Sequence, residues 1–435
     1  MRSDRRGNGG SKGVRERFGC GPTAASGSPL VWLVVLLVGL ACGPGAGGVD
    51  TSVETRRVAA LPWDSVRARA RGTEVVWRMW RGDPSINAYV DRWVVPRLRD
   101  RHGVTLRAIE GHGPELVNQL VVEREAGRAG AGVASLVWIN GETFANLRRE
   151  RLLAGPWAGR LPNAAYVDSA SPIVARDFEQ DPAGYESPWG RVQFALIWDT
   201  LRTPRPPATV VELGAWIRAH PGRFTHDQGF TGVTFLKGVT YALNGGARAL
   251  AGGFDEARYA AARAPTFAWL DSMTPAFWRG GRTYPPDVAA MHRLFANGEI
   301  DASMSNNQHD VVAKARQGIL PPTARAVLLR DASIANAHFL GIPFDAPNPA
   351  GAMVVADFLL SPEAQLEKLK PDVWADGTVL APARLPAEWR TRFAALAADP
   401  RAIPADTLAR YAQPEVGPRW HERLSADWRA TVRGR

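Results

Sequence analysis

Two apolar segments joined by a short polar break decide the fold: Ala335-Asn-Ala-His-Phe-Leu-Gly-Ile-Pro-Phe344, then Asn348-Pro349, then Ala350-Gly-Ala-Met-Val-Val-Ala-Asp-Phe-Leu-Leu360. The first segment is typical of a buried strand. Asn348 is a preferred helix cap and Pro349 is favoured in a first helical turn, so the second segment is predicted to be a helix. A buried strand that leads directly into a helix is the building unit of an α/β fold.

The same strand, loop and helix unit recurs in the chain before residue 335. Predicted strands cover Glu74–Trp80, Val104–Ile109, Val133–Trp138, Val192–Trp198, Arg223–Thr225 and Ile300–Met304. Helices are predicted to follow them, and Pro96 should kink or end the helix that begins after Asp83. Thr209-Val-Val-Glu212 is a capping box that opens a further helix. This alternation predicts an α/β body with mainly parallel sheets.

The N-terminal residues resemble an export signal. Residues 1–29 are basic and are followed by an apolar run of about eleven residues, Leu30–Leu40, which is too short to span a bilayer. The string Val38-Gly-Leu-Ala-Cys42 resembles a bacterial lipobox, although Gly39 stands where Leu is usual. In that chemistry the Cys thiol is acylated and becomes the new N-terminus, so Cys42 is the predicted lipidation site. The alternative is a membrane anchor that is not cleaved.

Composition is compatible with an exported, folded body. The 435 residues are 45% hydrophobic and 22% charged, which is enough for two lobes and disfavours disorder. The two cysteines, Cys20 and Cys42, both precede the body, which would therefore fold without disulfides. The net charge is +10, but the arginines are scattered, so nucleic acid is not an expected partner.

The loops that leave the carboxyl ends of the strands are the expected binding loops. They follow Trp80, Trp138, Thr225 and Met304. They offer carboxylates, amides, hydroxyls and indole faces, which suit a flat, cationic solute through charge pairing and cation–π contact. The candidate ligand-binding residues are Trp80, Asp83, Asn140, Glu142, Trp198, Asp199, Thr231, Trp278, Ser305, Asn306 and Asn307.

Each of these residues also has a structural alternative. Asp83 precedes Pro84 and can cap a helix, Asn306 and Asn307 can be caps, and Trp198 can brace a hinge. The ligand has alternatives as well. Helix N-termini favour anions and Arg282 lies near Trp278, so an anion or a zwitterion stays open, as does a sugar.

Catalytic and cofactor motifs are absent from the sequence. The eight His form no metal pattern, there is no nucleophile elbow, and no Cys follows Cys42. We therefore expect no cofactor, no metal and no catalysis. The chain also lacks a Walker loop, so an ATPase would be a separate subunit. An exported two-lobed enzyme such as a hydrolase is the alternative hypothesis, and a purely structural envelope protein is a third.

Six strings carry a family resemblance: Arg81-Gly-Asp-Pro-Ser-Ile-Asn-Ala-Tyr89, Trp138-Ile-Asn-Gly-Glu142, Gly222-Arg-Phe-Thr225, Trp278-Arg-Gly-Gly-Arg-Thr-Tyr-Pro285, Ala337-His-Phe-Leu-Gly-Ile-Pro343 and Ala356-Asp-Phe-Leu-Leu-Ser-Pro-Glu-Ala-Gln365. They resemble extracellular solute-binding proteins of ABC importers, in particular the thiamine-transport-like branch of the type II periplasmic-binding-protein superfamily. The resemblance runs from about Trp77 to Trp374 and weakens beyond.

The resemblance implies a two-lobed α/β fold that closes over a small ligand, with a hinge crossed more than once. It implies delivery of that ligand to permease subunits in the membrane, and a periplasmic or cell-surface protein anchored by lipid. Crossings are expected near Phe194–Trp198 and His338–Pro343. The expected segments are 1–42 signal peptide, 43–72 tether, 73–193 first part of lobe 1, 194–336 lobe 2, 337–372 return to lobe 1, and 373–435 C-terminal helical segment.

Overall fold

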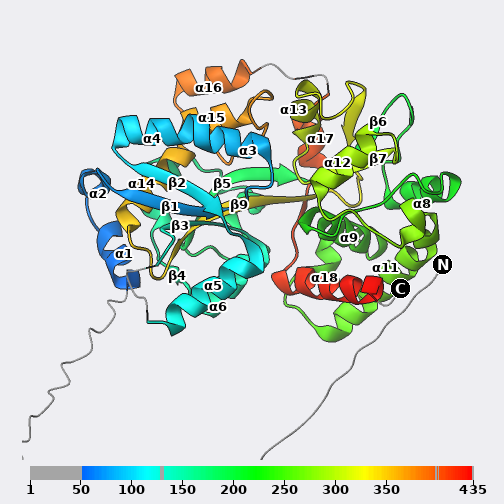
Figure 1. The fold of residues 1–435 in the computed structure, drawn as a ribbon, viewed down its shortest axis with the longest axis horizontal. Helices are drawn as coiled ribbons and strands as arrows, with labels where there is room; N and C mark the ends of the chain where they lie inside the picture. The colour runs from blue at the N-terminus through cyan, green and yellow to red at the C-terminus, as the bar shows by residue number, and fades with distance from the viewer. Residues whose placement is uncertain (1–50, 128–131, 397–398, 400, 434–435) are drawn as a thin grey trace, which may run out of the picture. The chain divides into compact units, whose positions relative to one another are not determined.

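The computed structural model describes residues 51–127, 132–396, 399 and 401–433. The expected signal peptide and the lipidation site Cys42 lie outside the described residues, as do residues 43–50 of the expected tether. Residues 51–72 do not form a tether: they contain the helices α1 (Thr51–Ala59) and α2 (Trp63–Ala70), because Val58, Val66 and Ala70 are buried in the core of the first lobe. The described chain forms two α/β lobes, each built around its own sheet (Figure 1). None of the described helices is long and apolar enough to cross a membrane.

The sheet of the first lobe has the strand order β10-β9-β3-β1-β2. Its strands are β1 (Glu74–Met79), β2 (Thr105–Glu110), β3 (Leu136–Ile139), β9 (Ile334–Pro343) and β10 (Gln413–Pro414), and β4 (Leu153–Ala154) and β5 (Glu186–Gln193) also pair with β9. Strands β1, β2 and β3 are parallel, whereas β3, β4 and β5 run antiparallel to β9. The sheet is therefore mixed, and the prediction of mainly parallel sheets is wrong, because β9 enters from the second lobe and runs against its neighbours.

Helices cover this sheet on both faces. They are α1 (Thr51–Ala59), α2 (Trp63–Ala70), α3 (Pro84–Ala88), α4 (Val95–His102), α5 (Gly113–Glu125), α6 (Gly141–Arg149), α7 (Pro172–Ala175), α14 (Pro349–Leu360), α15 (Pro362–Leu369) and α16 (Ala387–Ala394), with short 3₁₀ turns at Ala158–Arg160, Pro162–Tyr166 and Pro382–Arg384. Pro96 does not end its helix, although the α-helical pattern is interrupted just before it. A π-helical stretch, Tyr89–Val94, leads into α4, where Pro96 lies in the first turn and its missing N–H is tolerated.

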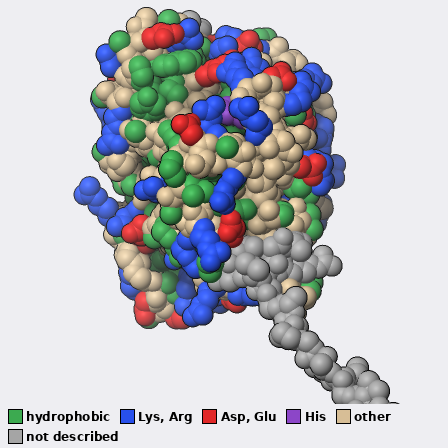
Figure 2. Space-filling model, turned by 90° about the vertical axis from the view of Figure 1, so that its left-hand side faces the viewer, with side chains coloured by type: hydrophobic (Ala, Val, Ile, Leu, Met, Phe, Trp, Pro, Cys, Tyr) green, Lys and Arg blue, Asp and Glu red, His purple; other side chains and the backbone are tan. Residues whose placement is uncertain are grey.

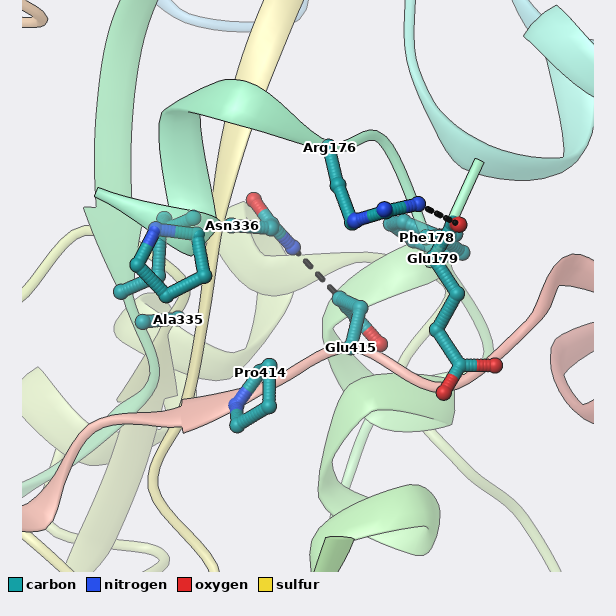
Figure 3. A pocket seen from close by; sticks show the side chains of 9 residues that line it. Arg176, Phe178, Glu179, Ala335, Asn336, Pro414 and Glu415 are labelled. Atoms are coloured by element: carbon teal, nitrogen blue, oxygen red, sulfur yellow. Dashed lines mark hydrogen bonds between the residues drawn. The ribbon is translucent and has the colours of Figure 1, made fainter. Parts of the chain in front are cut away.

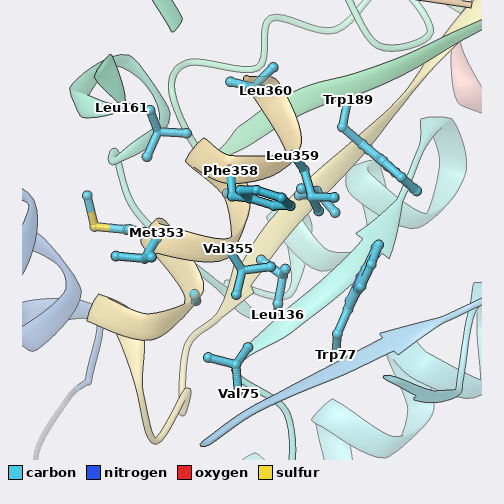
Figure 4. Close-up of a cluster of buried hydrophobic side chains, with 14 of the residues drawn as sticks. Val75, Trp77, Leu136, Leu161, Trp189, Met353, Val355, Phe358, Leu359 and Leu360 are labelled. Atoms are coloured by element: carbon cyan, nitrogen blue, oxygen red, sulfur yellow. The ribbon is translucent and has the colours of Figure 1, made fainter. Parts of the chain in front are cut away.

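One hydrophobic core of the first lobe lies between the sheet and α14, and a second joins the sheet to α5 and α6. Val75, Trp77 and Leu136 of the sheet face Val355 and Leu359 of α14 (Figure 4). Each of these five side chains is fully buried. Burial of one such side chain stabilises the fold by roughly 1.5–3 kcal/mol, so this apolar helix is held by its packing more than by its helical propensity. At its start, Asn348 accepts a hydrogen bond from the Gly351 N–H, as the predicted cap should.

The second lobe has a smaller, fully antiparallel sheet with the order β7-β6-β8. Its strands are β6 (Ala195–Asp199), β7 (Ala302–Ser305) and β8 (Ala324–Val327). Its helices are α8 (Val210–Ala219), α9 (Phe230–Leu243), α10 (Ala247–Leu250), α11 (Glu256–Met273), α12 (Val288–Ala296), α13 (Asp310–Arg316), α17 (Ala405–Tyr411) and α18 (Pro418–Arg433), with 3₁₀ turns at Thr274–Ala276 and Trp278–Gly281. The predicted strand Arg223–Thr225 is wrong. That segment is irregular, and the Phe224 carbonyl accepts instead from the Trp278 N–H of a turn.

The chain passes between the lobes at three places. Strand β5 of the first lobe gives way to β6 of the second at Phe194, whose N–H donates to the Ile334 carbonyl at the start of β9. Strand β9 then carries the chain back. After α16, the chain crosses again, and α18 buries Trp420 and Leu424 in the core of the second lobe. A hinge with more than one crossover is thus confirmed, and the expected C-terminal helical segment divides between the two lobes.

On the face of the molecule shown in Figure 2, the basic side chains do not gather into a single patch. Figure 2 shows one face of the molecule on which Lys and Arg side chains lie in several groups, separated by acidic, hydrophobic and uncharged ones. Several of the arginines pair with carboxylates, for example Arg101 with Glu363 and Arg107 with Glu74.

Candidate binding site

The two lobes meet first at Asp83, directly after β1. One carboxylate oxygen, Oδ1, accepts from the N–H groups of Ser85 and Ile86 at 2.7 and 3.4 Å, so Asp83 caps α3. The other oxygen, Oδ2, lies 2.5 Å from Nζ of Lys314, on α13 of the second lobe. The alternative that Asp83 is a helix cap is therefore confirmed, and the same carboxylate also makes an ion pair across the lobes.

The loop after β7 supplies a second contact. Asn307 donates from Nδ2 to the Ala375 carbonyl, which follows α15 of the first lobe, at 3.2 Å. Asn306 donates from Nδ2 to Oγ1 of Thr231, at the start of α9, at 3.1 Å. Ser305 donates to Asp310 at 3.1 Å and accepts from the Asn307 N–H. The structure thus brings together four of the predicted residues, Thr231 and Ser305–Asn307, on the second lobe.

The third contact involves Glu142, in the first turn of α6. Its Oε1 lies 3.9 Å from Nε2 of His421 on α18, and its Oε2 is buried without a hydrogen-bond partner. The side chain is 16% exposed. Burial raises the pKa of the Glu142 carboxyl to about 7. Asn140 stands at the cap position of α6, but its side chain makes no capping bond.

Gly141 explains how this turn is held. Its φ is +47°, a conformation that favours glycine, and an added Cβ would lie 2.5 Å from the ring of Phe178. The Gly141 N–H donates to Oδ2 of Asp177 at 2.6 Å. The tight turn therefore holds the start of α6 next to Asp177 and Phe178. Glu142, the following residue, is positioned by the same turn.

Further carboxyls surround Glu142. Asp177 and Glu186 are buried, and burial raises the pKa of each well above its usual range. Glu415, after β10, pairs with Lys237 of α9, whose Nζ lies 2.5 Å away. The ammonium of Lys237 also lies 4.4 Å from the centre of the Phe178 ring. When ionised, these four carboxyls outnumber the Lys237 ammonium and the Arg148 guanidinium, which lowers the pKa of Glu186. Burial and the charge on Lys237 hold the pKa of His421 well below its usual value, which keeps its imidazole neutral.

A cavity of about 200 Å³ lies beside this group at the hinge (Figure 3). Its walls come from the segment after α7, from β9 and from β10. Asn336 of β9 donates to Oε1 of Glu415, and Arg176 donates to the Glu179 carbonyl. The Glu179 carboxylate accepts from the N–H groups of Gly252 and Gly417. Because the polar groups of this lining have partners within the protein, we assign the cavity to the hinge.

Four predicted residues are placed elsewhere. Trp198 is fully buried in the second core, against Trp216 with ring centres 4.8 Å apart. Asp199 pairs with Arg202 at 2.9 Å. Burial raises the pKa of Asp199, but hydrogen bonds from Thr323 and Arg202 lower it further, to below its usual value. We therefore leave Trp198 and Asp199 out of the site.

Trp278 and Trp80 are the other two. Trp278 lines a separate groove of about 430 Å³ on the second lobe, where the guanidinium carbon of Arg279 lies 4.2 Å from the centre of its ring. Trp80 is half-buried on the first lobe, and its ring covers Gly82.

Sequence analysis missed Lys237, His421, Phe178 and Lys314. Lys237 had a signal, because it is the one charged residue in α9, Phe230–Leu243, and a lone Lys in an apolar helix indicates a buried partner. His421 and Phe178 had none, because their partners lie far away in the sequence. Within the described residues, no group of three or more His, Cys, Asp or Glu side chains could hold a metal ion.

A comparison with known families decides what this architecture is. The family described as bacterial extracellular solute-binding protein matches residues 94–397, more than half of the chain. The chain belongs to this family. Protein YnjB of Escherichia coli (strain K12) is similar along almost its whole length, with 35% identity over 372 residues, which is 85% of this chain and 93% of that protein.

Solved structures of solute-binding proteins share the fold. The TpPotD lipoprotein Tp0655 of Treponema pallidum matches with a TM-score of 0.61 at 16% identity, over 83% of this chain and 100% of that one. The spermidine/putrescine substrate-binding protein PotD of Streptococcus pneumoniae matches with a TM-score of 0.58 at 13% identity, over 83% and 98%. Iron-bound HitA of Pseudomonas aeruginosa matches with a TM-score of 0.56 at 15% identity, over 82% and 99%. The expected two-lobed periplasmic-binding-protein fold is confirmed, and the solute-binding family is one of binding proteins and not of enzymes.

Proposed function

We propose that this solute-binding protein is the substrate-binding component of an ABC importer and captures a small organic cation between its lobes. The observation that supports this proposal is the Glu142 carboxylate, whose Oε2 is buried at the junction of the lobes without a partner. A buried polar atom without a hydrogen bond lowers stability by roughly 1–3 kcal/mol, and by more when it is charged. A ligand ammonium or ring nitrogen placed against Oε2 would supply the missing partner.

The surroundings of Glu142 favour positive charge. The neighbouring carboxyls Glu415 and Glu422 oppose the ionisation of Glu142, and the Lys237 ammonium favours it. Aromatic rings complete the environment, since Phe230 stacks on His421 with ring centres 5.2 Å apart. Such faces attract organic cations, and Phe178 already accepts the Lys237 ammonium in this way.

Two resemblances support the choice of an organic cation, whereas HitA, a third protein of similar fold, is iron-bound. The resemblance in sequence is to a thiamine-transport-like branch, and thiamine is a flat organic cation. One protein of similar fold is named for spermidine and putrescine, which are linear organic cations. We propose that thiamine-like or polyamine-like solutes are the class to test first.

Delivery completes the proposed function. The closed protein would present its ligand to permease subunits in the membrane, with the ATPase on a separate subunit. Lipid attached at Cys42 would hold the protein at the membrane surface, and one protein of similar fold is itself described as a lipoprotein.

Thermal shift followed by calorimetry tests this proposal. Thiamine, putrescine and spermidine are the probes, with citrate and maltose as anionic and sugar controls, because a ligand that binds the folded state raises the melting temperature. Glu142→Gln should weaken the binding of an organic cation by roughly 1–3 kcal/mol. Glu150→Gln, at the solvent-exposed end of the same helix, is the matched control and should leave affinity unchanged. Stabilisation by citrate or maltose alone, or full affinity in Glu142→Gln, would contradict the cationic ligand.

A pH series sharpens the same test. Because the pKa of Glu142 is about 7 and a bound cation favours its ionised form, affinity should rise as the pH increases from 6 to 8. The Glu142→Gln variant should lose this dependence.

A further inference from the structure

We infer that Lys314 acts as a built-in cation that occupies Asp83 and latches the two lobes together, leaving Glu142 to meet the charge of the solute. The two acids, which the sequence presents as equivalent, then have different tasks. Asp83 governs lobe closure for any ligand, and Glu142 governs the preference for a cation. The assignment of Glu142 rests on the proposed function, whereas the latch itself does not.

The ion pair is placed where a latch must be. Lys314 lies on α13 of the second lobe and Asp83 precedes α3 of the first, 231 residues away in the chain. The Lys314 side chain is 5% exposed and that of Asp83 is 17% exposed. Water therefore screens their attraction only weakly, so the pair resists separation more than a surface pair would.

The Asp83 carboxylate has no oxygen left for a solute. Oδ1 accepts from two backbone N–H groups of α3, and Oδ2 accepts from the Lys314 ammonium. Glu142 differs, because its Oε2 accepts from no described group. A cationic solute that paired with Asp83 would have to displace an ammonium that is already held in place.

The second lobe holds Lys314 in position. Oδ1 of Asp310, one turn earlier on α13, lies 3.8 Å from its Nζ. Asp310 is itself fixed through Oδ2, which lies 3.2 Å from Nε2 of His292 and accepts from Ser305 at 3.1 Å. Burial lowers the pKa of Lys314, but the charges of Asp310 and Asp83 raise it above its usual value, so the side chain carries its charge.

A neutral bond accompanies the ion pair. Nε2 of Gln317, on the turn after α13, donates to Oγ of Ser85 at 3.0 Å. Both the charged and the neutral contact join α13 to α3, and both partners are fixed before they meet. Little side-chain freedom is lost when the lobes close, which is why this contact is suited to a latch.

The test measures the distance between the lobes without any ligand. Val122 on α5 and Val211 on α8 are 61% and 72% exposed, one on each lobe. Spin labels at Val122→Cys and Val211→Cys, in the full chain with Cys20→Ser and Cys42→Ser, report lobe separation by pulsed electron resonance. Lys314→Met removes the ammonium and keeps the length of the side chain. We expect it to lower the ratio of closed to open molecules roughly tenfold, which is about 1.4 kcal/mol.

Two further variants define the mechanism. Asp83→Asn should open the lobes to a similar extent, and the double variant Asp83→Asn/Lys314→Met should be no more open than either single variant, since both remove one interaction. Arg101→Met, which breaks the Arg101–Glu363 pair within the first lobe, is the matched control and should leave the distances unchanged. The circular dichroism of each variant establishes that it is folded, and Asp83→Asn replaces Lys314→Met if the latter does not fold.

Some outcomes would overturn the latch and leave the proposed function intact. One is a distance distribution that is unchanged in both Lys314→Met and Asp83→Asn. Another is a wild-type protein whose lobes are already open without ligand. The third is a double variant in which the opening caused by the two single variants adds. If both variants open the lobes as expected but the wild-type protein binds no organic cation, the result would contradict the proposed function and leave the latch intact.

Discussion

Nζ of Lys237 lies 2.5 Å from Oε2 of Glu415, and both side chains are inaccessible to solvent, 0% and 3% exposed. Lys237 is in the middle of α9 in the second lobe, and Glu415 follows β10 at the hinge. Asn336 of β9 donates to the other oxygen of Glu415 at 2.9 Å. One buried ion pair therefore fixes the second lobe against the strand through which the chain returns to the first.

Removal of the Lys237 ammonium should destabilise the fold strongly. Lys237→Met leaves the Glu415 carboxylate buried and unpaired, and loss of one partner of a buried pair typically costs about 3–5 kcal/mol. Urea unfolding followed by tryptophan fluorescence measures the change in the free energy of unfolding.

A double variant provides the control for this prediction. Lys237→Met/Glu415→Gln removes the stranded charge and should recover a large part of the loss. Exposed ion pairs usually contribute less than about 1 kcal/mol. If Lys237→Met lowers the free energy of unfolding by less than this, the pair is not buried in solution.

Glu142 should make the stability of the ligand-free protein depend on pH. Its pKa is about 7 in the fold and 4.5 in the unfolded chain, so the folded state binds the proton more tightly. The resulting stabilisation is complete below pH 4.5 and is lost as the pH rises through 7, a change of about 3 kcal/mol. Asp177 and Glu186, whose pKa values burial also raises, contribute in the same direction. Asp310 and Asp376, whose pKa values burial raises but neighbouring cations and hydrogen bonds lower further, to below the usual value, contribute in the opposite direction. The free energies of unfolding of wild type and Glu142→Gln at pH 5 and pH 8 isolate the share of Glu142, and parallel curves for the two proteins would refute it.

The two predicted tryptophans of the second lobe should separate into different roles. Trp198→Ala should lower the free energy of unfolding by about 3–5 kcal/mol, because it empties a fully buried site. Trp278→Ala, in its separate groove, should cost much less. Calorimetry with spermidine or thiamine should show that the folded fraction of each variant binds as wild type does. A large loss of affinity in Trp278→Ala at unchanged stability would restore it to the binding site.

Lipid attachment is the fourth prediction, and it concerns residues that the structure does not describe. Mass spectrometry of the protein isolated from membranes should find an acylated Cys42 as the first residue. Cys42→Ser should release the protein from the membrane fraction. Molecules that retain residues 1–41 in wild type would show that the signal is not cleaved at this site.

The sequence alone was sufficient to predict the α/β class and several helix starts, because these depend on local chemistry. Asn348 caps α14 and Thr209 caps α8 as predicted, since a cap needs only a side-chain oxygen within a few residues of the free N–H groups. The direction of β9 was not predictable in the same way. It depends on which neighbours the strand meets after it crosses the hinge, and apolar strands of either direction look alike in sequence.

The candidate residues show the same division. The sequence by itself determined that carboxylates and amides follow the strands. It predicted binding roles for Glu142 and Asn307, which the structure places in a first helical turn and in a loop that meet the opposite lobe. Only the tertiary structure decided that Asp83 already has an ammonium partner, that Glu142 has an oxygen without one, and that Trp198 faces the core. The physical reason is that pairing and burial are set by contacts between residues far apart in the chain, here 231 positions for Asp83 and Lys314, whereas local sequence specifies only the conformation of the backbone that carries them.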